Sequence, residues 1–177
     1  MPTSVLVEPA GPKYARYQEI CEELHHLLSS EKNLVANAAN TSALLFNRLP
    51  DINWAGFYLA EGRELVLGPF QGKPASTRIA FGKGVCGTAA IRGRTIVVPE
   101  VSKFPGHIVC DPASQSEIVV PLLNWGRLVG VLDVDSASPK RFDADDQEGL
   151  ESVAAVFLAS LIEAGYPDLS EDAATAD

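Results

Sequence analysis

The sequence predicts an α+β domain that carries a long functional loop. Apolar residues recur at helical spacing in three stretches, residues 13–29, 33–48 and 143–163. Two pairs of β-rich runs, at 52–70 and 117–135, each surround a short turn, which is typical of antiparallel hairpins. About eighteen residues, 99–116, have no clear periodicity, and loops of that length inside a compact domain are usually functional.

Composition limits the class of protein. With 177 residues, of which 46% are hydrophobic, the chain is long enough for one sizeable core. We divide it into a flexible arm (1–12), a single domain (13–165) and an acidic disordered tail (166–177). The net charge of -9 argues against nucleic acid as a partner, because an acidic surface repels phosphates. We expect no signal peptide, no membrane association and a cytoplasmic location.

Three cysteines without a C-x-x-C pair predict neither a disulfide framework nor a zinc ribbon, and no metal is expected. Cys21 lies on the apolar stripe of the first helix, as a packed small side chain would. Cys86 falls in the first turn of a short helix predicted over 84–92. Backbone N–H groups and the helix dipole are expected to lower the pKa of its thiol there. The glycines before it, in GKGVCGT, lack the spacing of a phosphate-binding loop.

The first hairpin turns at Glu61-Gly62-Arg63. Alternation in its first strand puts Trp54, Gly56 and Tyr58 on one face. A glycine between two aromatic residues either leaves open space for a ligand or serves sheet packing alone.

The second hairpin carries three carboxylates in otherwise apolar strands. Glu117 opens one strand, and Asp133 and Asp135 close the other, so an antiparallel pairing brings them to the same end. Whether they share a face depends on the register, which the sequence does not specify. Like charges this close would raise at least one pKa, and a carboxyl that is partly protonated at neutral pH can donate a proton. Exposed strand-end carboxylates are the alternative.

Five strings between residues 53 and 136 closely resemble the free methionine-(R)-sulfoxide reductases, a single-domain GAF family: NWAGFYL, LGPFQGK, GKGVCGTA, FPGHIVCDPASQSEIVVPL and GVLDVDS. The resemblance runs roughly from Ser30 to Leu161. It implies a central antiparallel sheet of about six strands, with the terminal helices on one face. A ligand pocket is then expected on the other face, under the 99–116 loop.

The resemblance also implies a site and a chemistry. Cys110 would attack the sulfur of free L-methionine-(R)-sulfoxide as a thiolate, and Glu117 would protonate the sulfoxide oxygen. Cys86 would then form a disulfide with the resulting sulfenic acid. The substrate ammonium would be held by Glu117, Asp133 and Asp135, and its methyl-sulfoxide end would be enclosed by the aromatic rings of Trp54 and Tyr58.

The family usually has a third cysteine, at the position that Ser76 occupies here. This departure leaves Cys86 as the expected partner of Cys110 if an intramolecular disulfide forms. No bound cofactor is expected, since thioredoxin, reduced by NADPH through thioredoxin reductase, would reopen the disulfide. A homodimer is compatible with the sequence.

Three alternatives stay open. A Cys86–Cys110 disulfide could be a structural staple worth roughly 3.5 kcal/mol by chain entropy, although a reducing cytoplasm argues against it. His107 could lower the pKa of Cys110 or only fold the loop, and we favour the loop role because no carboxylate is evidently placed to orient its ring. The chain could also be a non-catalytic GAF sensor module, against which stands the lack of an output domain in the sequence.

Overall fold

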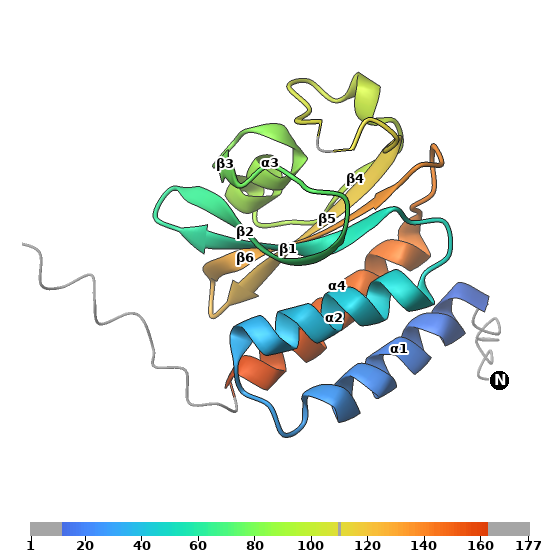
Figure 1. Cartoon of the computed structure of the whole chain (residues 1–177), viewed down its shortest axis with the longest axis vertical. Helices are drawn as coiled ribbons and strands as arrows, with labels where there is room; N and C mark the ends of the chain where they lie inside the picture. The colour runs from blue at the N-terminus through green and yellow to red at the C-terminus, as the bar shows by residue number, and fades with distance from the viewer. Residues whose placement is uncertain (1–11, 110, 163–177) are drawn as a thin grey trace, which may run out of the picture.

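A six-stranded antiparallel sheet separates two layers of the molecule (Figure 1). The structure is a computed structural model, and it describes residues 12–109 and 111–162. Its elements are α1 (Pro12–Leu28), α2 (Leu34–Arg48), β1 (Trp54–Glu61), β2 (Glu64–Gly72), β3 (Arg78–Ala80), α3 (Gly84–Arg92), β4 (Ile96–Val98), the 3-10 turn η1 (Val101–Lys103), β5 (Ser116–Asn124), β6 (Arg127–Ser136) and α4 (Ala144–Ile162). The strand order is β3-β2-β1-β6-β5-β4. The predicted α+β class and antiparallel sheet are confirmed.

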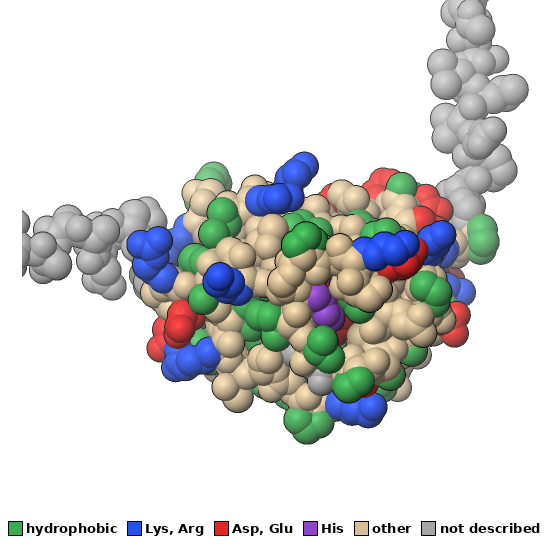
Figure 2. Space-filling view, turned by 90° about the horizontal axis from the view of Figure 1, so that it is seen from above, with side chains coloured by type: hydrophobic (Ala, Val, Ile, Leu, Met, Phe, Trp, Pro, Cys, Tyr) green, Lys and Arg blue, Asp and Glu red, His purple; other side chains and the backbone are tan. Residues whose placement is uncertain are grey.

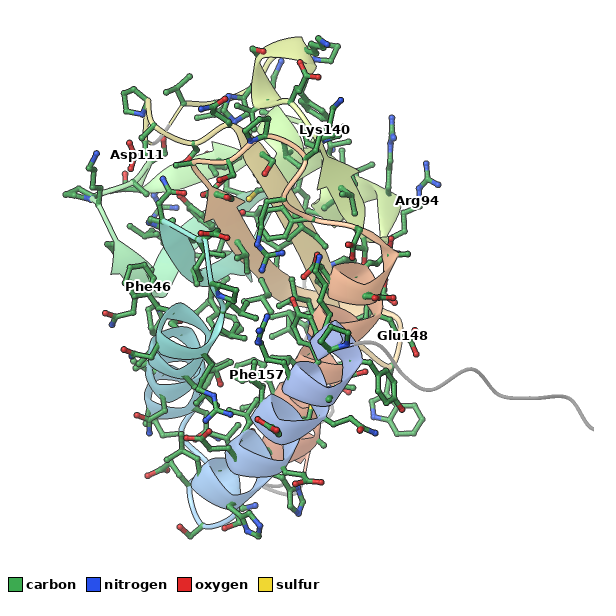
Figure 3. The ribbon with its side chains drawn as sticks, turned by 90° about the vertical axis from the view of Figure 1, so that its right-hand side faces the viewer. Phe46, Arg94, Asp111, Lys140, Glu148 and Phe157 are labelled. Carbon is green, nitrogen blue, oxygen red and sulfur yellow. The ribbon has the colours of Figure 1, made fainter. Side chains whose placement is uncertain are left out.

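The three long helices α1, α2 and α4 cover one face of the sheet (Figure 1). Apolar side chains of β1, β5 and β6 point into this layer and are almost fully buried. Phe57 of β1 meets Phe157 of α4 with ring centroids 4.6 Å apart, and Figure 3 shows Phe157 among the helices. Burial of one large apolar side chain contributes about 1.5–3 kcal/mol, so this layer is the main source of stability.

Polar caps set the helix boundaries close to where the sequence predicts them. Asn33 precedes α2, and its side chain accepts a hydrogen bond from the backbone N–H of Ala36 at 3.0 Å. Asp143 precedes α4, and its Oδ1 accepts hydrogen bonds from the N–H groups of Asp145 and Asp146. Helix α1 begins at Pro12, one residue before the predicted start, where proline's fixed φ suits a first helical turn.

The opposite face of the sheet carries α3 and the segment from 99 to 115, and the edge strand β3 lies beside α3 (Figure 1). Helix α3 lies unusually close to β3, because a Cβ at Gly87 would meet the carbonyl oxygen of Ala80 at 2.4 Å. The 99–115 segment is not wholly irregular, since it contains η1. It returns to the sheet through a hydrogen bond from the N–H of Val101 to the oxygen of Gln115 and one from the N–H of Gln115 to Ser136.

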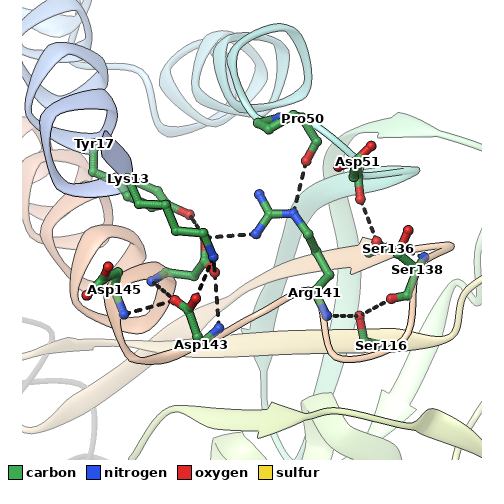
Figure 4. Close-up of polar contacts among 11 residues, drawn as sticks. Lys13, Tyr17, Pro50, Asp51, Ser116, Ser136, Ser138, Arg141, Asp143 and Asp145 are labelled. Carbon is green, nitrogen blue, oxygen red and sulfur yellow. Dashed lines mark hydrogen bonds and ion pairs between the residues drawn. The ribbon is translucent and has the colours of Figure 1, made fainter. Parts of the chain in front are cut away.

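A network of polar contacts ties the helices to the β5–β6 end of the sheet (Figure 4). The buried carboxylate of Asp146 accepts from Lys13 at 2.6 Å, from Arg141 at 2.9 Å and from Tyr17 at 3.0 Å. Arg141 also donates from Nε to the carbonyl oxygen of Pro50 and from its backbone N–H to Ser116. Ser116 directly precedes Glu117, so this network fixes the strand end that bears the first carboxylate.

Two predicted segments fall outside the description. Residues 1–11 of the predicted N-terminal arm and residues 163–177, which contain the predicted acidic tail, are not among the described residues. Within the part that is described, no helix combines the length and the apolar character needed to cross a bilayer.

Candidate active site

The strand register places the three carboxylates on one face of the sheet. Glu117 pairs with Asp135 across β5 and β6, and Val119 pairs with Asp133. On the other side of β6, Trp54 pairs with Asp135 and Gly56 with Asp133. Side chains of directly paired residues lie on the same side of an antiparallel sheet. The acids therefore face α3 and the 99–115 segment, with the aromatic side chains of β1 beside them.

These side chains line a narrow pocket between the sheet, α3 and the 99–115 segment. Its wall consists of Tyr58, Ile79, Gly84, Val85, Cys86, His107, Ile108, Asp111, Ser114, Glu117, Asp133 and Asp135. In the view onto this side of the molecule, a histidine with acidic atoms beside it is visible near the centre (Figure 2). The cavity volume is about 20 Å³, which is enough for one water molecule. A larger ligand requires the wall side chains to move apart.

Burial controls the electrostatics of the pocket. Glu117, Asp133 and Asp135 are only 5%, 6% and 8% exposed. Burial raises the pKa of each carboxyl well above its usual range, and repulsion from a neighbouring carboxylate raises it further. A side-chain hydrogen bond between Glu117 and Asp133 lowers the pKa of Glu117 somewhat and raises that of Asp133 further. Protonated carboxyl groups are thus favoured here at pH values at which exposed acids are ionised.

Cys86 lies in the same acidic environment. Its Sγ is 4.0 Å from Oε1 of Glu117, and its side chain is buried. The prediction that the helix N-terminus lowers its pKa is wrong, because burial and the charges of Asp133, Glu117 and Asp135 raise the pKa well above its usual value. Desolvation and three nearby carboxylates outweigh the dipole of a nine-residue helix. Cys86 is therefore held as a thiol.

His107 touches the acidic group from the loop side. Its Nε2 lies 3.2 Å from Oε2 of Glu117, and the two side chains are 13% and 7% exposed. Burial lowers the pKa of the imidazole. The sequence-based argument that no carboxylate is placed to orient this ring is therefore wrong. Residues 107 and 117 are separated by the rest of the loop, so only the fold reveals their contact.

The aromatic residues of β1 form one stacked group. Trp54 stacks on Phe70 at 5.2 Å and on Tyr58 at 6.0 Å between ring centroids. Tyr58 lines the pocket, whereas Trp54 lies behind it and donates from Nε1 to the carbonyl oxygen of Lys73. No open space exists at Gly56, since a Cβ there would meet Cβ of Phe70 at 2.3 Å. That glycine serves close strand packing, and the ligand-space interpretation of it is wrong.

Asp111 lines the pocket, and its only signal in the sequence is that of a turn, because Pro112 follows it. Its carboxylate accepts hydrogen bonds from the N–H of Ala113, from Lys73 and from Asn53 at 2.9–3.1 Å. These contacts lower its pKa. It lies on the side of the molecule opposite the long helices (Figure 3). An Asp-Pro step signals a turn, but the lysine and asparagine that hold the side chain are far away in the chain.

The predicted nucleophile, Cys110, lies outside the described residues. The other predicted site residues are described, and the pocket brings together Cys86, Glu117, Asp133, Asp135 and Tyr58. One ligand atom from each of Cys86, Glu117 and Asp133 lies within 4.8 Å of the others, which is also a spacing that a metal ion could use.

The pocket has the chemistry of a site for a small cation or ammonium group. Four of its described lining residues carry carboxyl groups, and none of them is a lysine or arginine. Oδ1 of Asp133 is buried and has no hydrogen-bond partner among the described residues. A buried polar oxygen without a partner costs about 1–3 kcal/mol, so a ligand that donates a hydrogen bond here gains that amount.

The chain is similar in sequence and in structure to proteins that are named for an enzymatic activity. The family model for the GAF domain matches residues 15–161. A protein of Escherichia coli called free methionine-R-sulfoxide reductase is 50% identical over 139 residues, 78% of this chain and 84% of that protein. One of the same name from Saccharomyces cerevisiae is 45% identical over 157 residues, 82% of this chain and 87% of that protein. The X-ray structure of free methionine-R-sulfoxide reductase from Neisseria meningitidis with its substrate superposes with a TM-score of 0.83 at 44% identity, over 87% of this chain and 93% of that one.

Proposed function

The chain belongs to the GAF-domain family and, within it, to the free methionine-R-sulfoxide reductases, and from this premise we propose that it reduces free L-methionine-(R)-sulfoxide to L-methionine. The observation that carries the proposal is the group of three buried carboxyl groups with an unpaired oxygen on Asp133. When these carboxyl groups ionise, a positively charged ligand stabilises them, and the ammonium of a free amino acid supplies that charge.

The acids explain the restriction to the free amino acid. The substrate ammonium contacts Asp133 and Asp135, with Glu117 beside them, and stabilises their ionised forms by direct charge pairing. Its carboxylate is bound by backbone N–H groups of the 99–115 segment. A methionine sulfoxide inside a peptide has neither charge and would leave buried carboxylates unpaired. The methyl-sulfoxide end packs against Tyr58, which Trp54 supports from behind.

Reduction is a two-electron transfer between two sulfur atoms. The thiolate of Cys110 attacks the sulfoxide sulfur, and Glu117 gives its proton to the sulfoxide oxygen. The oxygen passes to Cys110, the S–O bond of the substrate breaks, and methionine leaves. Cys110 is thereby oxidised to a sulfenic acid while the substrate sulfur is reduced. The raised pKa of Glu117 supports this role, because the group must hold a proton at neutral pH.

The second thiol completes the cycle. Cys86 condenses with the sulfenic acid of Cys110, which releases water and forms a disulfide. Its contact with Glu117 at 4.0 Å supports a thiol beside the reacting groups. Because Ser76 is not a thiol and Cys86 is the only cysteine among the described residues that line the pocket, no alternative pocket thiol is available there. Thioredoxin then reduces the disulfide by thiol exchange, with electrons from NADPH through thioredoxin reductase.

The test is an NADPH-coupled thioredoxin assay with free (R)- and (S)-methionine sulfoxide and with an N-acetylated, amidated (R)-sulfoxide. We expect turnover of the free (R)-isomer alone. The Cys110→Ser variant should be inactive, with Cys21→Ser as the matched control that stays active. Binding without turnover in the wild-type protein would favour a sensor module, and turnover by Cys110→Ser would exclude this nucleophile.

A further inference from the structure

Glu117 must regain a proton after every catalytic cycle, and the structure restricts how it can do so. In the mechanism above, the group ends each reduction as a carboxylate. It is then surrounded by Asp133 and Asp135 of β6 and by the thiol of Cys86 on α3. Burial and these like charges oppose the ionised form, but solvent has little access to a side chain that is 7% exposed.

One group connects this carboxyl to the pocket rim. Among the described residues, His107 is the only basic side chain with a contact to any of the three strand carboxyls, through Nε2 and Oε2 of Glu117 at 3.2 Å. Its side chain is about twice as exposed as that of Glu117, and it lies on the loop side of the pocket. The other charged group of the loop in the pocket, Asp111, is already paired with Lys73.

We propose that His107 is a proton relay that returns a proton from solvent to Glu117 between turnovers. The proposal rests on the proposed function, since it needs Glu117 to be the proton donor. In the resting pair, Oε1 of Glu117 carries the acidic proton and Oε2 accepts from Nε2–H of the ring. After Oε1 has protonated the sulfoxide oxygen, solvent gives a proton to Nδ1 while Nε2–H passes to Oε2, and rotation of the ring or proton exchange with water restores the Nε2–H form before the next turnover. Only O–H and N–H bonds change, no electrons move, and the imidazole ends neutral.

Imidazole chemistry fits this role better than any other side chain at the rim. Histidine exchanges protons near neutral pH, and a buried imidazole releases its proton more readily than an exposed one. The carboxylate of Glu117 favours the transient imidazolium, and Ile108 adds an apolar side chain to the same pocket wall. The relay therefore lets a water-poor pocket use a general acid repeatedly.

A purely structural role for His107, holding the loop by a hydrogen bond, makes a different prediction. Glutamine can keep a hydrogen bond to Glu117 but cannot carry a proton. A relay therefore fails in both His107→Gln and His107→Ala, and added imidazole restores the alanine variant. A structural role predicts that His107→Gln is active and that imidazole has no effect. His25→Gln is the matched control, since it changes an exposed histidine on α1.

The experiment follows methionine formation by rapid quench with fully reduced protein and excess free (R)-sulfoxide, using dithiothreitol as reductant. The first turnover of His107→Gln should proceed within about threefold of wild type, because Glu117 starts protonated. Later turnovers should slow by about tenfold or more, the range expected for a lost proton-transfer group. Imidazole should restore His107→Ala saturably, in proportion to its imidazolium fraction.

Two other results would each overturn one part of the proposal. Wild-type turnover in His107→Gln, or equal slowing of the first and later turnovers without imidazole rescue, overturns the relay. Absence of methionine from the wild-type protein refutes the proposed function instead, so the two failures are distinguishable. Circular dichroism checks that both variants fold. The pH profile of steady-state turnover is then measured on a variant that folds. Loss of the histidine should remove one ionisation from that profile.

Discussion

Replacement of Asp133 by asparagine should stabilise the protein and weaken its substrate binding at the same time. Burial and the charge of Glu117 raise the pKa of Asp133 in the folded state, whereas an unfolded aspartate titrates near 3.9. A group whose pKa is raised in the folded state contributes fully to the free energy of unfolding at pH values below its pKa in the unfolded chain. This stabilising contribution is lost as pH rises through the pKa of the group in the folded state, because the folded chain must then bury a charge. Asparagine never ionises, so the Asp133→Asn variant avoids this loss.

The size of the two effects follows from the surroundings of Asp133. The residue is 6% exposed, and its Oδ1 has no partner among the described residues. Removal of the ionisable group should raise the free energy of unfolding by about 1–2 kcal/mol at pH 8 and by almost nothing at pH 4. Loss of one partner of a buried charge pair costs about 2–5 kcal/mol of binding. That corresponds to roughly 30-fold to 4,000-fold weaker binding of the free amino acid.

Urea unfolding at pH 4, 6 and 8 and calorimetric titration with free methionine-(R)-sulfoxide measure both quantities. Asp145→Asn, an exposed aspartate in the first turn of α4, is the control and should change stability by less than about 0.5 kcal/mol. For the wild-type protein, affinity should increase as pH rises through the raised carboxyl pKa values, because ammonium binds the ionised acids. A less stable Asp133→Asn variant at pH 8, or one with unchanged affinity, would refute the reasoning.

Two further predictions concern the second thiol and the helical layer. Cys86→Ser should form one equivalent of methionine per protein but lose recycling by thioredoxin, as measured by quench and by NADPH consumption; full recycling would mean that another thiol forms the disulfide. Asp146→Asn should lower the free energy of unfolding at pH 7 by about 3 kcal/mol, because Arg141 and Lys13 lose a buried partner. Burial would raise the pKa of Asp146, but these partners hold it at about 2, so the difference from wild type should persist above pH 4 and disappear as pH falls toward 2. A difference that is constant from pH 7 to pH 2 would contradict this account.

The sequence predicted the elements well because their signals are local. Helical spacing of apolar residues and the turn at Gly62 each depend on a few neighbouring residues, and the structure places these elements within one or two positions of the predicted ones. The order β3-β2-β1-β6-β5-β4 is not local. The resemblance to a known family predicted an antiparallel sheet of about six strands but not their order.

The sequence predicted several of the residues that line the pocket, but not the contacts between them or the direction of every pKa shift. Alternation put Glu117 on one face of its strand and the aspartates on one face of theirs, yet only the register Glu117–Asp135 shows that these faces are the same. Burial of Cys86, together with the nearby charges of the three carboxyl groups, raises the pKa of its thiol and so reverses the direction of the expected shift. The pairing of His107 with Glu117 depends on the path of the loop, which no spacing in the sequence encodes.

The position of the acids explains why the molecule needs a strong helical layer. A pocket with three buried carboxyl groups and an unpaired oxygen opposes folding, and its own apolar cluster is the smaller of the two. The larger cluster lies on the other face of the same strands, where Ile118 and Val134 alternate with Glu117 and Asp135. Burial of those alternate residues against α1, α2 and α4 therefore holds the acids in place. A substitution that loosens this layer, such as Ile118→Ala, acts on the site through the strand that both faces share.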